Sequence, residues 1–208
     1  MPRTKSSRRW LARHVKDEFV RRARKHGARS RAVFKLKEID ERDRLFRPGM
    51  TVVDLGAAPG GWSQYAAGRV GPAGYVLAVD MLPLEPLQGV DFIQGDFTQG
   101  PVLDLMLERL HGRKADLVIS DMAPNITGIA AADQARSQEL AELALDFAAK
   151  TLCPGGNLLL KAFQGEGFEA LRREMQRRFA KLLTRKPKAS RPESREIYLL
   201  GKGFKDGE

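Results

Sequence analysis

The stretch from residue 51 to residue 67 constrains the fold of this chain more than any other. The apolar run Thr51–Leu55 predicts a buried strand, residues 56–61 form a glycine-rich turn, and residues 62–67 have a helical pattern. Glycines let a backbone approach a ligand closely, and a helix start offers free N–H groups. This order predicts a cradle for a nucleotide-like ligand, although a purely structural turn would explain any one of the glycines.

The spacing of the glycines narrows the class of ligand. Gly56, Gly60 and Gly61 give the pattern Gly-x-x-x-Gly-Gly, which is neither the dinucleotide pattern Gly-x-Gly-x-x-Gly nor a phosphate loop ending in Gly-Lys-Ser/Thr. The pattern therefore favours a nucleoside-type ligand without a phosphate chain.

Charge is distributed unevenly along the 208 residues, whose formal net charge is +10. Residues 1–37 hold 14 Lys and Arg against two Asp and Glu, residues 172–195 hold ten against two, and residues 38–171 hold ten against 19. Two basic segments on an acidic body indicate a polyanionic partner, with nucleic acid favoured. The alternative is that both segments are only solvated helix faces.

The basic N-terminal segment predicts an amphipathic helix over residues 1–26, which ends at Gly27. It could contact RNA phosphates, an anionic membrane or the protein itself. Ser30 is expected to cap a second helix whose inward positions are Val33, Leu36 and Ile39. We expect a helical arm over residues 1–29 and a single domain over residues 30–208.

Several classes of protein are disfavoured by composition. A single cysteine, Cys153, and three scattered histidines offer no intrachain disulfide and no metal-ligand spacing, so no metal is expected. No apolar run is long enough for a membrane span. We expect a cytoplasmic monomer; the Arg- and Ser-rich start leaves a mitochondrial transit peptide as the alternative.

Strand and helix patterns alternate regularly after residue 50. Strands are expected at 51–55, 75–79, 92–94, 115–120, 157–160, 182–184 and 197–200, with helices near 62–69, 101–111, 131–152 and 166–180. This alternation predicts an α/β fold with a mostly parallel seven-stranded sheet covered by helices on both faces. The short link between the last two strands makes them an antiparallel pair.

Ionisable residues recur where the predicted strands end, which is the ligand-binding edge of a parallel sheet. Asp54, Asp80, Asp96, Asp121 and Lys161 are the members of this set. Asp80 is placed to hold a ribose hydroxyl pair, and Asp96, beside Phe97, to accept from an adenine amino group. Turn capping is the alternative for Asp54 and Asp96, and an ordinary strand-end charge is the alternative for Lys161.

The last strand brings one more acid to the same edge. Glu196 begins this strand, which runs antiparallel to its neighbour, so we expect Glu196 to reach Lys161.

Five segments together resemble the FtsJ/RlmE family of ribosomal RNA 2′-O-methyltransferases. They are Ser30-Arg31-Ala32-x-Phe34-Lys35-Leu36, residues 53–64, Ser120-Asp121-Met122-Ala123-Pro124-Asn125, Lys161-x-Phe163-Gln164-Gly165 and residues 194–198. The resemblance covers residues 6 to about 201. It implies a Rossmann-like methyltransferase fold, S-adenosylmethionine as methyl donor, and a uridine ribose of large-subunit ribosomal RNA as acceptor, on the assembled subunit.

The resemblance also implies which residues act. Its catalytic tetrad falls on Lys35, Asp121, Lys161 and Glu196. Its cofactor contacts fall on Gly60, Trp62, Asp80, Asp96 and Asp121, with Gly61 and Phe97 as their neighbours. A ribose hydroxyl needs a base to take its proton, and Lys161 is the candidate; a charged Lys161 that orients the hydroxyl is the alternative.

Other functions remain open at this point. Transfer RNA or an mRNA cap could be the substrate, and a non-catalytic RNA-binding assembly factor could keep the same fold. A nicotinamide-dependent oxidoreductase shares the strand, glycine turn and later acid, but the chain lacks Gly-x-Gly-x-x-Gly.

Overall fold

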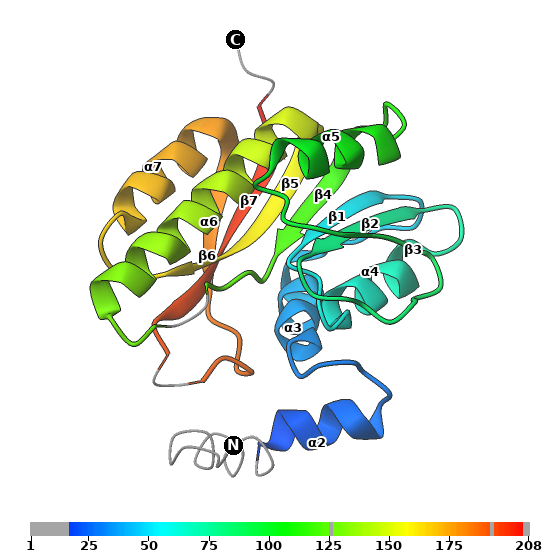
Figure 1. Ribbon diagram of the computed structural model, residues 1–208, viewed down its shortest axis with the longest axis horizontal. Helices are drawn as coiled ribbons and strands as arrows, with labels where there is room; N and C mark the ends of the chain where they lie inside the picture. The colour runs from blue at the N-terminus through cyan, green and yellow to red at the C-terminus, as the bar shows by residue number, and fades with distance from the viewer. Residues whose placement is uncertain (1–16, 125–126, 192–193, 206–208) are drawn as a thin grey trace.

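The computed structural model describes residues 17–124, 127–191 and 194–205, which are built around one seven-stranded sheet (Figure 1). The strands are β1 (Thr51–Leu55), β2 (Tyr75–Asp80), β3 (Val90–Gln94), β4 (Ala115–Ser120), β5 (Leu152–Phe163), β6 (Phe179–Arg185) and β7 (Glu196–Phe204). Their order is β3-β2-β1-β4-β5-β7-β6; neighbours from β3 to β5 are parallel, and β7 is antiparallel to both β5 and β6. The predicted α/β fold and sheet are confirmed.

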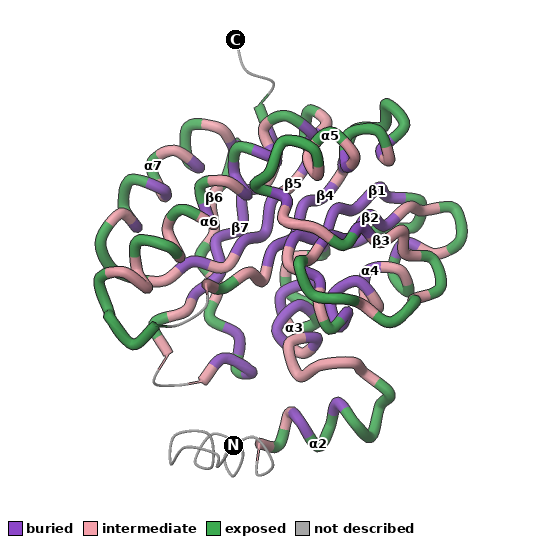
Figure 2. The backbone as a smooth tube through the Cα atoms, in the orientation of Figure 1, coloured by how far each residue is buried: buried purple, intermediate pink, exposed green. Residues whose placement is uncertain are grey.

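Helices cover both faces of the sheet (Figures 1 and 2). They are α2 (Glu18–Lys25), α3 (Val33–Asp43), α4 (Gly61–Val70), α5 (Gly100–Arg109), α6 (Ala130–Thr151) and α7 (Phe168–Arg178). The helices α5, α6 and α7 pack on one face and α3 and α4 on the other, so each face has its own buried apolar cluster. Alternate apolar side chains of β1 belong to different clusters, with Val53 and Leu55 in one and Val52 in the other, which explains why both faces of the strand are buried.

The N-terminal helix is described only from residue 17, as α2, and the earlier residues of the predicted helix lie outside the described residues. The chain leaves α2 at His26, and Gly27 follows with a φ of +64°. The division into an arm over residues 1–29 and a domain over residues 30–208 stays a prediction.

Strand β5 begins five residues before its predicted start at Asn157. Leu152 pairs with Ala115 of β4, and the register then shifts before Asn157 pairs with Leu117. The sequence Pro154-Gly155-Gly156 is typical of a turn, but here it forms an irregular stretch inside the strand.

The start of α3 differs from the prediction. The helix begins at Val33 with Ala32 at its N-cap, and no side chain caps it, so the predicted cap by Ser30 is wrong. The Ser30 hydroxyl instead occupies the space that a side chain at Gly61 would need. Gly61 therefore lets the chain entering α3 pack against the start of α4. The predicted inward positions Val33, Leu36 and Ile39 are buried.

Candidate active site

The glycine turn after β1 holds a backbone conformation that needs glycine. Gly56 has a φ of +78° and Gly60 a φ of +101°. A Cβ at Gly56 would collide with the Met122 side chain and lie 3.3 Å from the Met122 Cα. The turn is thus in close contact with the segment that follows β4, and both border the carboxyl edge of the sheet.

We expect Gly56→Ala to lower the free energy of unfolding by about 1–3 kcal/mol, because alanine is strained at positive φ and Met122 must move. Gly68→Ala is the matched control, since Gly68 lies within α4 with open space around it and should gain about 0.5–1 kcal/mol from helix propensity. Urea denaturation of both variants measures the difference. Equal stability of the two would contradict a conformational requirement for glycine at position 56.

Asp80, the last residue of β2, ties this turn to the neighbouring strand. Its Oδ2 accepts from the Ala58 N–H at 2.9 Å, and its Oδ1 accepts from the Leu82 N–H at 2.8 Å. The carboxylate therefore lies beside the glycine turn, where the sequence placed it. Its predicted contact with a ribose stays a prediction.

Three more of the predicted cofactor residues, Asp96, Phe97 and Trp62, differ in where their side chains lie. Asp96 Oδ1 accepts from the N–H and the hydroxyl of Thr98, at 3.0 and 2.7 Å, and so caps a turn. Phe97 is buried in the apolar cluster on the α5 side of the sheet. Trp62 is also buried, and its Nε1 donates to the Ala32 carbonyl at 2.8 Å, so the ring nitrogen already has a partner within the protein.

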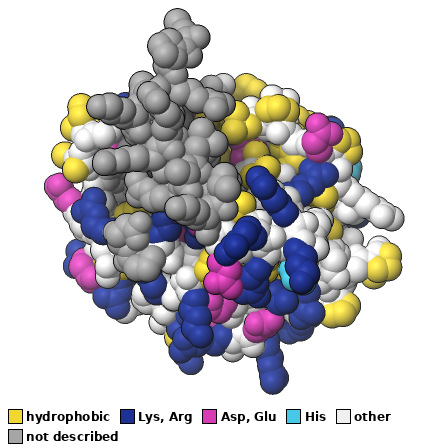
Figure 3. Space-filling model, turned by 90° about the horizontal axis from the view of Figure 1, so that it is seen from below, with side chains coloured by type: hydrophobic (Ala, Val, Ile, Leu, Met, Phe, Trp, Pro, Cys, Tyr) yellow, Lys and Arg dark blue, Asp and Glu magenta, His cyan; other side chains and the backbone are white. Residues whose placement is uncertain are grey.

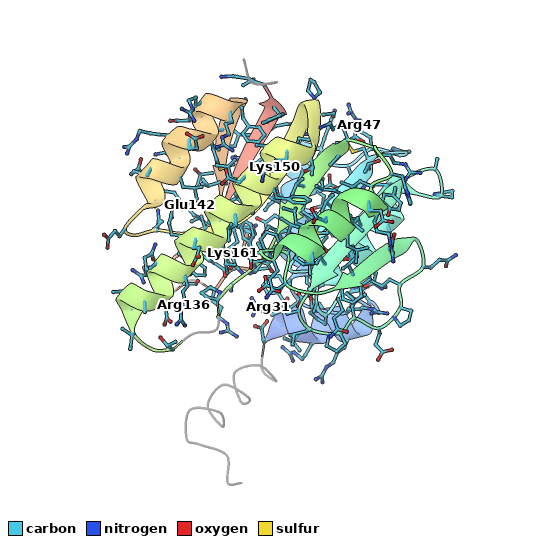
Figure 4. All side chains as sticks on the ribbon, turned by 45° about the horizontal axis from the view of Figure 1, so that its top comes forward. Arg31, Arg47, Arg136, Glu142, Lys150 and Lys161 are labelled. Atoms are coloured by element: carbon cyan, nitrogen blue, oxygen red, sulfur yellow. The ribbon has the colours of Figure 1, made fainter. Side chains whose placement is uncertain are left out.

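Lys161 and Asp121 form the first half of a polar network at the carboxyl edge of the sheet. Lys161 projects from β5 near the centre of the molecule (Figure 4). Its Nζ donates to the Asp121 backbone carbonyl at 2.6 Å and lies 3.0 Å from Asp121 Oδ1. These two contacts leave one ammonium N–H of Lys161 for a third partner.

Tyr198 joins this pair to the second half of the network. Its hydroxyl donates to Asp121 Oδ1 at 2.6 Å and accepts from Lys35 Nζ at 3.0 Å. Lys35 Nζ also lies 2.8 Å from Glu196 Oε1 and 3.9 Å from Asp121 Oδ1. The four predicted catalytic residues therefore lie together, linked through a tyrosine hydroxyl.

Strand register explains which residues meet. In the antiparallel pair of β5 and β7, Lys161 lies opposite Tyr198, while Glu196 lies opposite Phe163. The prediction that Glu196 reaches Lys161 is therefore wrong, because Glu196 pairs with a different lysine. Among the described residues, Glu196 forms its ion pair within 4 Å with Lys35 of α3.

Burial and charge act in opposite directions on the acids of the network. Burial would raise the pKa of Asp121, but Lys161, Lys35 and the Tyr198 hydroxyl outweigh burial and lower that pKa below its ordinary value. Burial would also raise the pKa of Glu196, and Lys35 lowers it. Burial, Asp121 and Glu196 raise the pKa of Tyr198 well above its ordinary value. Both carboxyls are thus anionic at neutral pH, and the tyrosine is a hydrogen-bond donor.

The two basic segments of the sequence come together beside this network. Arg31 forms an ion pair with Asp17, which caps α2, and donates to the Ala189 carbonyl after β6. The backbone N–H of Lys188 donates to Glu38 of α3 at 2.9 Å. Figure 3 shows many Lys and Arg side chains on this face of the molecule.

Residues 17–124, 127–191 and 194–205 were searched for a metal site and for a membrane-spanning helix. No group of three His, Cys, Asp or Glu side chains in these ranges could hold a metal ion. No helix in them is both long and apolar enough to cross a membrane.

Comparison with known proteins shows the family to which this chain belongs. The model of the FtsJ-like methyltransferase family matches residues 28–204, which contain the glycine turn and the whole network. The chain belongs to the FtsJ-like methyltransferase family. It is 57% identical over 205 residues to the ribosomal RNA large subunit methyltransferase E of Stutzerimonas stutzeri, with 99% of this chain and 100% of that protein covered.

Two further relatives agree with this assignment. The protein of the same name from Alkalilimnicola ehrlichii is 59% identical over 202 residues, covering 97% of each chain. The crystal structure of a protein described as a ribosomal RNA methyltransferase from Plasmodium falciparum superposes with a TM-score of 0.74 at 29% identity, covering 85% of this chain and 98% of that one.

Two polar residues of this FtsJ-like methyltransferase were not predicted as members of the site. Tyr198 lies two residues after Glu196, so both side chains point to the same face of β7, and this period of two would have found it. Ser63, on α4, donates from its hydroxyl to Asp54 Oδ2 at 2.6 Å. No sequence signal distinguishes this serine from an ordinary helix residue.

Proposed function

We propose that this protein transfers a methyl group from S-adenosylmethionine to the 2′-hydroxyl of a uridine ribose in large-subunit ribosomal RNA, with the assembled subunit as substrate. The observation that carries the proposal is the network of Lys161, Asp121, Tyr198, Lys35 and Glu196 beside the glycine turn. The names of the two bacterial relatives support ribosomal RNA as the substrate class.

The residues around the glycine turn fit S-adenosylmethionine, which carries positive charge and no phosphate. Carboxylates of Asp80 and Asp121 border the turn, and the first-turn N–H groups of α4 suit the carboxylate of the ligand. When bound, this donor supplies an electrophilic methyl group on a positively charged sulfur. The residues proposed to hold it are Gly60, Gly61, Trp62, Asp80, Asp96, Phe97 and Asp121.

Lys161 is the group proposed to contact the ribose hydroxyl. As the neutral amine it takes the hydroxyl proton while the methyl is transferred, and it becomes an ammonium that Asp121 neutralises at 3.0 Å. Lys35 and Tyr198 hold Asp121 in place from the other side. The network therefore keeps the acceptor hydroxyl and the proton-accepting group in one fixed arrangement.

Helix α2 is proposed to contact RNA phosphates. We expect replacement of its exposed Arg21, Arg24 and Lys25 by glutamine to weaken RNA binding and to reduce the salt slope, −dlogK/dlog[salt], by about 2, because each lost phosphate contact contributes about 0.7 for single strands. Cofactor affinity should not change. Binding is measured by fluorescence anisotropy at several salt concentrations.

The matched control replaces Arg113, Lys114 and Lys150, which are exposed beside the opposite, amino ends of β4 and β5. This variant loses the same charge and should keep the wild-type slope. An equal loss of slope in both variants would show that net charge, not α2, governs RNA binding.

The decisive experiment for the proposed function is methyl transfer from labelled S-adenosylmethionine to large ribosomal subunits, free ribosomal RNA and transfer RNA, followed by mapping of the modified ribose. Label on a uridine 2′-oxygen in the subunit is expected. Label on transfer RNA alone would keep the chemistry and change the substrate, and cofactor binding without label on any RNA would favour a non-catalytic assembly factor. The monomeric state and the cytoplasmic location stay predictions.

A further inference from the structure

Asp54 is a buried acid that the proposed methyl transfer does not use. It lies within β1, just before the glycine turn, and its residue is 1% exposed. Its Oδ2 accepts from the Ser63 hydroxyl at 2.6 Å, whereas its Oδ1 is buried and has no hydrogen-bond partner among the described residues. A fully buried carboxylate with one donor is costly, because an unpaired buried charge loses its hydration.

The charged groups that face Asp54 from the neighbouring strands are also acids. Asp80 lies at the end of β2 and Asp121 just past the end of β4, and α4 contributes the hydroxyl and the backbone of Ser63. Lys161 and Lys35 lie 3.0 and 3.9 Å from Asp121 Oδ1, so their positive charge is placed beside Asp121. Burial first, and then the two neighbouring carboxylates, raise the pKa of Asp54 to about 7 against the opposing hydrogen bond from Ser63.

We infer that Asp54 is a proton-linked residue of the cofactor cradle: its carboxyl is protonated in the empty protein and ionises when the cationic methyl donor binds. The proton leaves the Asp54 carboxyl for solvent, and the carboxylate that remains balances the positive charge of the ligand. This inference rests on the proposed use of S-adenosylmethionine and assigns a role to an acid outside the catalytic network.

Proton linkage makes cofactor affinity depend on pH. Binding requires the ionised carboxylate, so affinity should rise with pH up to about 7 and then level off. We expect S-adenosylmethionine to bind about 25-fold more tightly at pH 7.5 than at pH 5.5, since the ionised fraction of an acid whose pKa is about 7 changes by that factor between these two values.

Titration calorimetry tests the inference without any measurement of activity. S-adenosylmethionine is titrated into the full-length protein at pH 7 in phosphate, HEPES and Tris, whose ionisation enthalpies differ, and the slope of binding enthalpy against ionisation enthalpy counts protons. The wild type should release about half a proton at pH 7, because an acid whose pKa is about 7 is half protonated there. Asp54→Asn should release none and should bind with an affinity that is flat from pH 5.5 to 7.5.

Ser63→Ala gives a second test that does not remove the acid. It removes the hydroxyl that donates to Asp54 Oδ2 at 2.6 Å and lowers the pKa of that acid, so the rise of affinity with pH should move to higher pH. Binding by the wild type without proton release, or equal proton release by Asp54→Asn, would overturn the inference while leaving the proposed function intact. Failure of the wild type to bind S-adenosylmethionine would overturn both.

Discussion

Lys161→Ala is expected to reduce the rate of methyl transfer by about 10²–10⁴-fold, the range that a positioned proton-transfer group contributes. The variant removes the side chain of the network that is proposed to contact the acceptor hydroxyl. Cofactor affinity should stay near the wild-type value, because Lys161 is not among the residues proposed to hold S-adenosylmethionine. Single-turnover transfer of labelled methyl to the large subunit, and calorimetric titration with S-adenosylmethionine, measure the two quantities.

Lys161→Arg separates proton transfer from charge. Arginine keeps the positive charge beside Asp121 but does not give up a proton in proteins, so it cannot act as the base. We expect this variant to be as inactive as Lys161→Ala. Substantial activity in the arginine variant would reassign Lys161 to stabilising developing negative charge, and wild-type turnover in the alanine variant would remove it from the mechanism.

The carboxyl edge of the sheet could be located from sequence because strand ends are marked by composition. Asp80 ends the apolar run of β2, Asp121 follows the run of β4, and Lys161 interrupts the run of β5. Parallel strands bring their carboxyl ends together at one edge of the sheet. Only the strand–helix alternation was needed to place these three residues on one edge. Their positions are confirmed, and their roles in binding and catalysis stay predictions.

The pairing inside the network could not be predicted from sequence. Whether Glu196 meets Lys161 or Lys35 depends on the register of β7 against β5 and on how α3 packs over both strands. A shift of register by two residues would keep every side chain on its face and change every partner. The period of two places Tyr198 on the same face of β7 as Glu196, but it does not show that the Tyr198 hydroxyl meets Asp121 and Lys35.

Local sequence signals failed where tertiary contacts decide the backbone. Ser30 has the composition of a helix cap, yet its side chain packs against Gly61. Pro154-Gly155-Gly156 has the composition of a turn, yet pairing with β4 keeps it within β5. In each case the competing contact comes from a residue distant in sequence.

Asp121→Asn is expected to lower the free energy of unfolding by about 3–5 kcal/mol and to stop methyl transfer, because two buried lysines then lose the carboxylate between them. The change is isosteric, and asparagine can still accept from the Tyr198 hydroxyl, so the loss reports charge. Urea denaturation at pH 7 measures it. Asp96→Asn is the matched control; that carboxylate caps only a local turn, and its loss should cost about 1 kcal/mol or less.

The pH dependence identifies Asp121 as the source of this loss. Lys161 and Lys35 outweigh burial and lower the pKa of Asp121 in the folded protein. The Asp121 carboxylate therefore stabilises the fold fully above the ordinary aspartate pKa of about 3.9, and this stabilisation is lost as pH falls through the lowered pKa. The stability difference between wild type and Asp121→Asn should therefore be constant from pH 5 to 7 and shrink below about pH 4. A difference that is small at pH 7 would contradict the role of Asp121 as the counter-charge of the two buried lysines.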